Sequence, residues 1–312
     1  MKSIHKIKHK LKNPVVTVGT FDGVHLGHQK IMNTLVNRAK TIGGVSVVIT
    51  YHPHPLEILN NRHFPYLLTE KIKKEDFLKE IGIDYVLWLD FNEQLVNLSP
   101  EDFIKKYFVE MLASKEIIIG YDWHFGKNRE GDYHLLKKFE KIYGYKTDVV
   151  REVKVGSEII SSTKIREYIR KGNIELAKKM LGRDYSILGR VAQGDKIGRQ
   201  LGFPTTNLEP VEPRKLLPEY GVYLTKVKFH HKYLWGITNI GRKPTIKRNN
   251  RRKFIETYIF DFNEDIYSEE IELIFIRKMR NEKEFANREE LIEQIKLDES
   301  IARCIIDIRN LT

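Results

Sequence analysis

Residues 15–28 read VVTVGTFDGVHLGH, and this stretch decides the fold of the first half of the chain. The apolar run that opens it predicts a buried β-strand, and the apolar spacing that follows it predicts a helix over Gln29–Lys40. Between the two lies a glycine-rich turn that carries two histidines, His25 and His28. Phosphate groups tend to bind at a strand-to-helix turn of an α/β sheet, where unpaired backbone N–H groups point outward. The stretch therefore predicts a phosphate site at the start of a helix.

The alternation of strand and helix continues through the first half of the chain. The strand-like apolar runs are Val15–Gly19, Val45–Thr50, Tyr85–Leu89, Ile117–Gly120 and Lys146–Val150. The helix-like stretches between them are Gln29–Lys40, Glu70–Ile81, Pro100–Leu112 and Tyr133–Tyr143. Alternating strands and helices with right-handed connections form a parallel sheet that is covered on both faces. We therefore expect a Rossmann-like α/β domain.

The pattern changes in the second half. Two more helical stretches, Thr163–Arg170 and Ile174–Leu181, are followed by a connector at Gly182–Asp184. Beyond it, β-branched and aromatic runs separated by turn residues predict the antiparallel strands of a small barrel or sandwich. These runs are Val222–Phe229, Tyr233–Ile240, Phe254–Phe260 and Glu270–Ile276. An amphipathic stretch over Arg288–Arg309 predicts a C-terminal helix, so we expect an α/β domain over residues 1–184 and a β domain over 185–312.

Composition bounds the class of protein. The chain has 312 residues, of which 41% are hydrophobic, and no apolar run approaches the ~20 residues that a membrane span needs. The N-terminus is charged and has no apolar segment of the kind found in a secretory signal. Cys304 is the single cysteine, so no internal disulfide can form. We therefore expect a cytoplasmic protein with no membrane partner.

The formal net charge of +12 allows two interpretations. One is a nucleic-acid-binding protein with a basic face, and the other is an enzyme that acts on small molecules rich in phosphate. Basic residues are scattered along the chain among acidic ones, and only Arg242–Lys253 is densely basic. The chain has no zinc-finger spacing, no RNA-recognition motif and no heptad-linked basic region. The enzyme is therefore the stronger interpretation, and we expect no nucleic-acid partner.

The residue types of the first turn suit a nucleoside triphosphate. A helix N-terminus offers unpaired N–H groups and a partial positive charge, and histidines add donors whose protonation adapts. Glycines allow a phosphate to approach the backbone closely. Two histidines alone are more often ordinary surface residues at a turn. The combination of His25, Gly27 and His28 on a strand-turn-helix unit favours binding.

A second polar stretch, Ile160–Arg166, reads ISSTKIR. Ser162 or Thr163 can simply cap the helix that follows. The same hydroxyls, with Lys164 and Arg166 close by, can also bind an anion. The stretch is weak evidence alone, but it gains weight from the histidine-containing turn in the same predicted domain.

Together, GTFDGVHLGH and ISSTKIR resemble the nucleotidyltransferase superfamily, and more closely the N-terminal module of the bacterial bifunctional riboflavin kinase/FAD synthetase family. The likeness continues through Thr50–Pro55, Gly120–Gly126 and Arg129–Asp132, although His52 stands where the family usually has Asp. The resemblance implies that ATP is bound by Gly19, Phe21, Asp22, Gly23, His25, Gly27, His28, Ser162, Thr163 and Arg166, with His25, His28 and Arg166 in catalytic roles. It implies that the flavin is bound by Asp122, Trp123 and Phe125, although aromatic residues in this pattern are more often core.

The second half resembles the kinase module of the same family. Residues 194–207, GDKIGRQLGFPTTN, resemble its glycine-rich loop and PTAN motif, with Thr206 in place of Ala. Asn239–Thr245 and Ile255–Phe262 continue the likeness, with Tyr258 where His is common. The resemblance implies an ATP site at Gly194, Gly198, Arg199, Gly202, Thr205 and Asn207. It also implies Mg²⁺ ligation by Thr205 and Asn207, whose oxygens are hard donors, and a general base at Glu256.

The implied protein is a multifunctional transferase with an α/β Rossmann-like nucleotidyltransferase domain, a small antiparallel β-barrel kinase domain and a C-terminal helix. Its kinase would convert riboflavin and ATP into FMN and ADP, and its adenylyltransferase would convert FMN and ATP into FAD and pyrophosphate, both with Mg²⁺. Other interpretations stay open. Taken alone, Glu256 reads as a solvent-facing strand residue. Arg242–Lys253 reads as either a mobile loop beside the kinase site or a solvated hairpin tip. In a further alternative the chain keeps one of the two activities, and the other module is a regulatory binding unit. The sequence leaves the oligomeric state undecided.

Overall fold

The computed structural model describes residues 1–5, 10–59, 66–193, 201–242 and 253–310. The chain divides into two compact units, Met1–Ser162 and Thr163–Thr312. Each unit has its own hydrophobic core. Within the described ranges, no helix is both long and apolar enough to cross a membrane.

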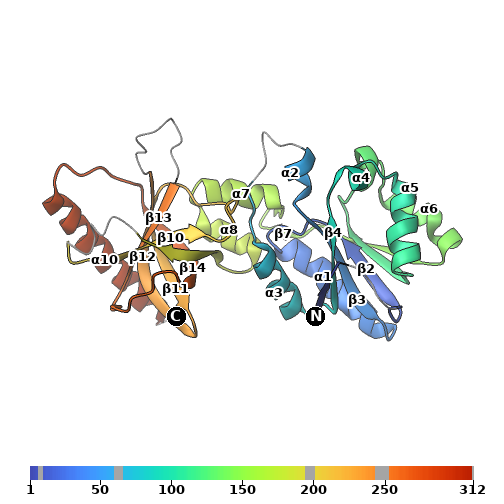
Figure 1. Ribbon diagram of the computed structural model, residues 1–312, viewed down its shortest axis with the longest axis horizontal. Coiled ribbons are helices and arrows are strands. Elements are labelled where there is room, and N and C mark those ends of the chain that lie inside the picture. Colours follow the sequence, from blue (N-terminus) through green and yellow to red (C-terminus); the bar gives the residue numbers. More distant parts are fainter. Residues whose placement is uncertain (6–9, 60–65, 194–200, 243–252, 311–312) are drawn as a thin grey trace. The chain divides into compact units, whose positions relative to one another are not determined.

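The first unit is built on a six-stranded sheet whose strands are all parallel, in the order β1-β4-β3-β2-β5-β6. Figure 1 labels β2, β3 and β4 of this sheet. The strands are β1 (Lys2–Ile4), β2 (Pro14–Val18), β3 (Val45–His52), β4 (Tyr85–Asp90), β5 (Glu116–Gly120) and β6 (Lys146–Val150). The helices are α1 (Leu26–Thr41), α2 (Pro55–Leu59), α3 (Lys71–Ile81), α4 (Glu93–Val96), α5 (Pro100–Phe103), η1 (Ile104–Met111), η2 (Lys127–Arg129) and α6 (Tyr133–Tyr143). A small antiparallel hairpin joins β7 (Lys154–Val155) to β8 (Glu158–Ile159).

Helices cover both faces of this sheet. Alternate strand residues, such as Val15 and Val16 of β2, face opposite sides and are both fully buried. Helices α1 and α3 pack on one face, and α5, η1 and α6 pack on the other. Strands buried on both faces read as continuous apolar runs, which is why the sequence identified them. The predicted α/β architecture is confirmed.

Several boundaries differ from the prediction. Helix α1 begins at Leu26 rather than Gln29, so His25 is its N-cap and His28 lies in its first turn. The predicted helix over 100–112 is split into α5 and a wider π-helical segment, η1. Strand β1 was not predicted, because a three-residue strand in a lysine-rich terminus has too little apolar pattern.

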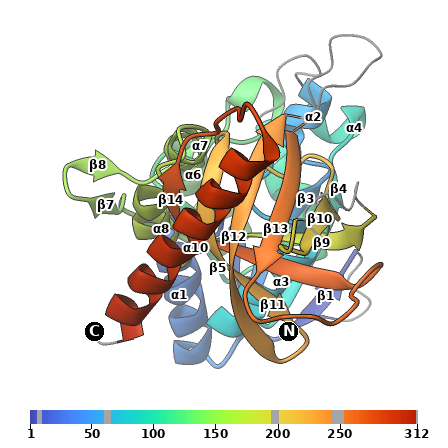
Figure 2. The same cartoon turned by 90° about the vertical axis from the view of Figure 1, so that its left-hand side faces the viewer.

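The second unit is a closed six-stranded barrel in the order β10-β13-β12-β11-β14-β9, with every neighbouring pair antiparallel. Its elements are α7 (Ser162–Arg170), which starts one residue before the unit, α8 (Ile174–Leu181), β9 (Tyr185–Ala192), β10 (Thr205–Pro210), β11 (Gly221–Phe229), β12 (Lys232–Arg242), β13 (Lys253–Ile259), β14 (Glu270–Arg280) and α10 (Arg288–Asn310). Helix α10 lies across the outside of the barrel (Figure 2), where Ala302 and Ile306 pack on strand residues such as Val222 and Leu224. The predicted barrel and C-terminal helix are confirmed, whereas strands β9 and β10 were missed.

Candidate active sites

The strand order of the parallel sheet reverses between β2 and β5. From β2 the chain continues through α1 to β3 and then to β4 on one side, whereas β5 and β6 lie on the other. Ligands of open α/β sheets bind beyond the carboxyl ends of the strands at such a switch point. The turn after β2 carries His25 and His28, and the turn after β5 carries Asp122 and Trp123. Because β2 pairs with β5, the two predicted sets of residues follow neighbouring strand ends.

The two histidines stack at the first turn of α1. His25 caps the helix, and its Nδ1 accepts a hydrogen bond from the backbone N–H of His28 over 3.3 Å. The imidazole centroids are 3.5 Å apart at 18°, and the ring of Phe21 meets that of His28 edge-on at 5.2 Å. A Cβ on Gly27 would lie 3.2 Å from the His25 ring, so glycine leaves room for the stack. Both imidazoles are therefore fixed at the positive end of the helix dipole.

The turn before α1 has a strained backbone. Phe21 and Val24 are buried non-glycine residues with φ of 46° and 39°, and Gly23 between them has φ of 89°. Positive φ costs a non-glycine residue about 1–3 kcal/mol and persists only where the surroundings enforce it. Such strain is concentrated at functional sites, which agrees with the predicted role of this turn.

Asp22 makes several of the hydrogen bonds that hold this conformation of the turn. Its carboxylate, 1% exposed, accepts hydrogen bonds of 3.0–3.1 Å from the backbone N–H groups of Leu68 and Thr69. Its carbonyl oxygen accepts a 2.8 Å hydrogen bond from the hydroxyl of Ser162. Asp22 and Ser162, both predicted to bind ATP, thus make contacts that brace the turn. Thr163 and Arg166 fall in the second unit, and their part in an ATP site stays a prediction.

The predicted flavin residues divide into a core residue and exposed ones. Phe125 is buried in the core of the first unit, and Trp123 stacks on it with centroids 4.5 Å apart at 10°. Trp123 is half-buried, and Asp122 is exposed. Phe125 is therefore a core residue, whereas Trp123 keeps an accessible surface and its contact with a flavin stays a prediction.

In the second unit, polar side chains line up across three strands. Asn207 on β10 and Asn239 on β12 are both register partners of Glu256 on β13. Thr205 lies two residues before Asn207, on the same face of β10, and its hydroxyl donates a 2.6 Å hydrogen bond to Oε1 of Glu256. The structure thus brings together the three kinase residues predicted on β10 and β13.

These four residues line a cavity of about 610 Å³ between the barrel strands and α10. Most of its other walls are apolar, formed by Leu201, Phe203, Val222, Ile237, Phe254, Phe285, Leu291 and Ile295. Ligand pockets of this size and character hold one small organic molecule, oriented by a few polar groups. The charged residues of the lining are Arg242, Glu256, Arg280, Glu282, Lys283 and Asp298. A largely apolar pocket with Glu256 in one wall suits a flat aromatic compound that carries a hydroxylated chain.

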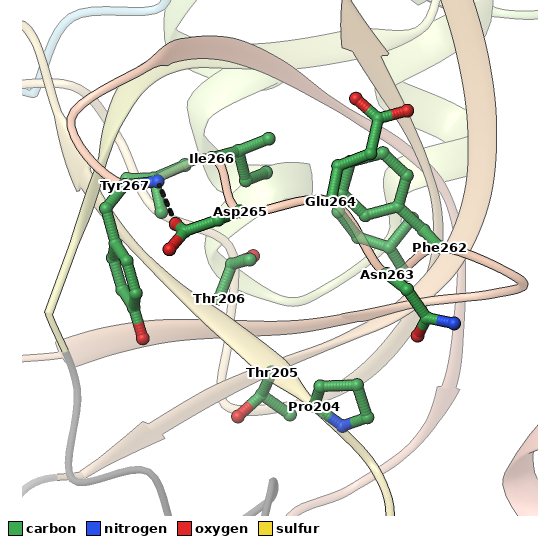
Figure 3. Close-up of a pocket in the computed structure, with 11 residues that line it drawn as sticks. Pro204, Thr205, Thr206, Phe262, Asn263, Glu264, Asp265, Ile266 and Tyr267 are labelled. Atoms are coloured by element: carbon green, nitrogen blue, oxygen red, sulfur yellow. Dashed lines mark hydrogen bonds between the residues drawn. The ribbon is translucent and has the colours of Figure 1, made fainter.

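Thr205 also lines a second, smaller cavity of about 300 Å³. Figure 3 shows Pro204, Thr205 and Thr206 on one side of it and the loop Phe262–Tyr267 around the other. The loop is braced by a 3.1 Å hydrogen bond from the backbone N–H of Tyr267 to the carboxylate of Asp265. The hydroxyl that contacts Glu256 thus belongs to a residue in the walls of both cavities.

Some predicted residues lie outside the described ranges. These are Gly194, Gly198 and Arg199 of the kinase ATP site, and residues 243–252 of the basic cluster. Gly202 is described and exposed, with φ of 86°.

The two ends of the basic cluster, Arg242 and Lys253, lie 4.4 Å and 4.5 Å from the ring centroid of Tyr220. Burial lowers the pKa of Lys253.

Three further residues of the large cavity had no predicted role. Asn239 has a buried Oδ1 without a hydrogen-bond partner among the described residues, and a polar atom of this kind in a cavity wall is available to a ligand. Arg280 and Asp298 form an ion pair of 2.7 Å in the same wall. The sequence shows Asn239 only as a polar residue in an apolar run, and nothing in it links Arg280 to Asp298.

Within the described part of the chain, no three His, Cys, Asp or Glu residues cluster closely enough to hold a metal ion. Mg²⁺ sites that serve ATP need no such cluster, since phosphates and water complete the shell around one or two protein oxygens. The side-chain oxygens of Thr205 and Asn207, on one face of β10 beside Glu256, fit that requirement.

A doubly covered parallel sheet with histidines at its switch point, followed in the chain by a barrel with two cavities that share Thr205, defines a two-module transferase of phosphate groups. Residues 7–164 match the family model of FAD synthetase, and residues 181–306 match that of riboflavin kinase. The chain belongs to the bifunctional riboflavin kinase/FMN adenylyltransferase family.

Individual relatives agree with this membership. The bifunctional riboflavin kinase/FMN adenylyltransferase of Buchnera aphidicola subsp. Schizaphis graminum is 40% identical over 97% of each chain. The protein of the same name from Escherichia coli K12 is 37% identical, over 93% of this chain and 91% of its own. A crystal structure named as a macrolide-efflux protein from Streptococcus pneumoniae is 29% identical, with a TM-score of 0.87 over 97% of this chain and 98% of its own. The architecture described above therefore recurs over the full chain of a solved structure.

Proposed function

We propose that this chain makes FAD from riboflavin in two ATP-dependent steps at two separate sites. The barrel unit phosphorylates riboflavin to FMN and releases ADP. The parallel-sheet unit transfers AMP from a second ATP to FMN and releases pyrophosphate. The observation that carries the proposal is the hydrogen bond to Glu256 from Thr205, a residue in the walls of two cavities, since a kinase must bring two substrates together at one general base.

In the kinase step, each cavity receives one substrate. The apolar walls of the larger cavity suit the flavin ring, with the ribityl chain directed to Glu256, and the smaller cavity receives the base of ATP. Glu256 accepts the proton of the 5′-hydroxyl as its oxygen bonds to the γ-phosphorus, and the bond from that phosphorus to the ADP oxygen breaks. General-base assistance of this kind is typically worth about 10²–10⁴-fold in rate.

Thr205 and Asn207 would hold Mg²⁺ together with the phosphates of ATP. A bound Mg²⁺ neutralises the phosphate charge that develops during transfer. The Thr205 hydroxyl directs its proton to Glu256, which leaves an oxygen lone pair free for the cation.

In the adenylyl step, a phosphate oxygen of FMN attacks the α-phosphorus of ATP, and the bond to pyrophosphate breaks. Positioning and charge neutralisation dominate such a reaction. His25, His28 and the N-terminus of α1 supply donors for the phosphates, and Trp123, backed by Phe125, contacts the flavin ring. Thr163 and Arg166 stay the ATP ligands that the family resemblance predicts. We assign this reaction to residues 1–184 and the kinase reaction to residues 185–312.

Two reciprocal variants test the proposal, with FMN and FAD separated by chromatography. His28→Ala is expected to lower FAD formation from supplied FMN about 10²–10³-fold and to leave FMN formation unchanged. Glu256→Gln is expected to lower FMN formation about 10²–10⁴-fold and to leave FAD formation from supplied FMN unchanged.

The matched controls are His134→Ala and Glu209→Gln, since both residues are exposed and lie outside the two sites. Loss of both products in either folded site variant would contradict the assignment of separate sites. A wild-type protein that forms only one product would show that the other module is regulatory.

A further inference from the structure

The first turn of α3 carries an unusual set of charges. It contains Lys71, Lys73 and Lys74 and no acidic residue. Acidic side chains are favoured at this end of a helix, because its dipole is positive there. Lys74 is in addition only 6% exposed. A buried cation at the positive end of a helix opposes folding, so its presence calls for another reason.

The contacts of Lys74 supply that reason. Its Nζ donates a 2.7 Å hydrogen bond to the carbonyl oxygen of Thr20, the residue directly before the strained part of the ATP turn. The hydroxyl of Thr50 on β3 donates to the same oxygen over 3.3 Å. The turn thus receives side-chain donors from α3 and β3, in addition to the backbone N–H groups that bind Asp22.

We propose that Lys74 is a positioning residue for adenylyl transfer, whose ammonium holds the Thr20 carbonyl and thereby the strained turn that carries His25 and His28. The inference rests on the assignment of adenylyl transfer to this turn. A turn with two unfavourable φ values needs strong external contacts to keep one conformation. A charged donor is about twice as strong as a neutral one, so the Lys74 ammonium is a stronger donor to the Thr20 carbonyl than the Thr50 hydroxyl is.

The charge of Lys74 depends on pH. Burial lowers its pKa to about 8, the nearby Asp22 carboxylate opposes the fall, and Lys71 on the same helix adds to it. The ring of Trp88 on β4, 5.4 Å away, covers another side of the ammonium. As the pH rises through 8, Lys74 becomes a neutral amine and its hold on Thr20 weakens. FAD formation should therefore decline on the alkaline side.

Three variants of the full chain test this role. Lys74→Met removes the charge and the donor, Lys74→Arg keeps a charge that does not titrate, and Lys71→Met removes a neighbouring ammonium that makes no hydrogen bond to Thr20 in the described structure. The rate of FAD formation from supplied FMN is measured against pH at saturating ATP. The rate of FMN formation by the same preparation is the internal control.

Lys74→Met is expected to lower FAD formation about 10²-fold at neutral pH, the loss typical of a slightly misplaced site, with FMN formation unchanged. Lys74→Arg should restore most of the rate and abolish the alkaline decline. Lys71→Met should keep the neutral-pH rate and shift the decline to higher pH, because a repelling charge is gone.

A wild-type rate in Lys74→Met, or an unaltered alkaline decline in Lys74→Arg, would overturn the proposal. The arginine variant decides the matter even where the methionine variant fails to fold. Failure of the site assignment is recognised separately, because His28→Ala would then leave FAD formation intact.

Discussion

At the scale of a single residue, Thr205 lines two cavities of the barrel unit, and its hydroxyl donates a hydrogen bond to Glu256. Thr205→Val keeps the shape and removes the hydroxyl, which leaves the Glu256 carboxylate without this donor. Hydrogen bonds to charged groups contribute about 1.5–3 kcal/mol, so we expect the kinase kcat to fall roughly 10–100-fold and the KM for ATP to rise. The comparison is Thr206→Val, whose lost hydroxyl donates, among the described residues, only to the backbone oxygen of Thr257. If the two variants change the kinase kcat and the KM for ATP equally in steady-state assays, the Thr205 hydroxyl has no specific role in phosphoryl transfer.

Lys74 gives the first unit a distinctive dependence of stability on pH. Its pKa is about 8 in the folded chain and 10.5 in the reference state, so between these values the unfolded chain binds more protons. Stability must therefore rise over this interval, by at most about 3 kcal/mol. Relative to Lys74→Met, the wild-type protein should gain this amount between pH 8 and pH 10.5. Hydrogen exchange of amides in β2 and β3 measures this gain in the free energy of unfolding. The same dependence on pH in the wild-type protein and in Lys74→Met would refute a buried charge at Lys74.

At the scale of elements, the ion pair of Arg280 and Asp298 joins α10 to β14. Asp298 is 3% exposed, and it also accepts a 2.9 Å hydrogen bond from Gln294. Removing one partner of a buried pair typically costs about 3–5 kcal/mol, so Asp298→Ala should destabilise the barrel unit by that amount in urea unfolding. It should also weaken riboflavin binding, because the pair lines the large cavity.

The ion pair of Asp261 and Arg303 joins α10 to the turn after β13, but it lies on the surface. Exposed pairs contribute about 0.2–1 kcal/mol, so Asp261→Ala should have a small effect. Similar losses in Asp298→Ala and Asp261→Ala would show that the burial of the first pair adds nothing.

The elements that the sequence identified are those with a strong hydrophobic period. The parallel strands are buried on both faces, and the barrel strands β11 to β14 are rich in β-branched and aromatic residues. Strand β10 was not predicted because Thr205–Pro210 contains Asn and Pro, which favour turns. The start of α1 was misplaced because Gly27 and His28 have low helix propensity, and the cap is an imidazole rather than a usual capping residue.

The candidate sites were predictable only as lists of residues. Motifs pointed to Thr205, Asn207 and Glu256, but their convergence depends on the register of β10 and β13, which no local pattern encodes. The same holds for Asn239, which reaches the cavity through its pairing with Glu256. Lys74 carried no signal, since one lysine in a lysine-rich helix looks like solvated charge.

For the whole molecule, the division into two units predicts how the chain can be cut. Helices α7 and α8 cluster with the barrel, and their buried Ile169, Ile174 and Met180 would be absent from a fragment of residues 185–312. Both this fragment and residues 163–312 should convert riboflavin to FMN and form no FAD. The longer fragment should show a clearly higher Tm in thermal unfolding, because it keeps this apolar burial. Equal Tm values would favour a boundary at Asp184, and FAD formation by either would overturn the assignment of adenylyl transfer.

The edge of the parallel sheet at β1 has a consequence for how copies of the chain behave toward one another. Residues Lys2–Ile4 pair in parallel with Tyr85–Leu87 and so occupy the outer hydrogen-bonding groups of β4, whose Val86 and Leu87 are fully buried. A long apolar strand with an open edge is a template for intermolecular pairing, whereas a very short strand that carries a lysine is a poor one. Residues Lys2–Ile4 thus cover the edge of β4 and oppose intermolecular strand pairing there. Tags or truncations that displace these residues should expose the edge of β4 and increase self-association through it, whereas the closed barrel offers no such edge.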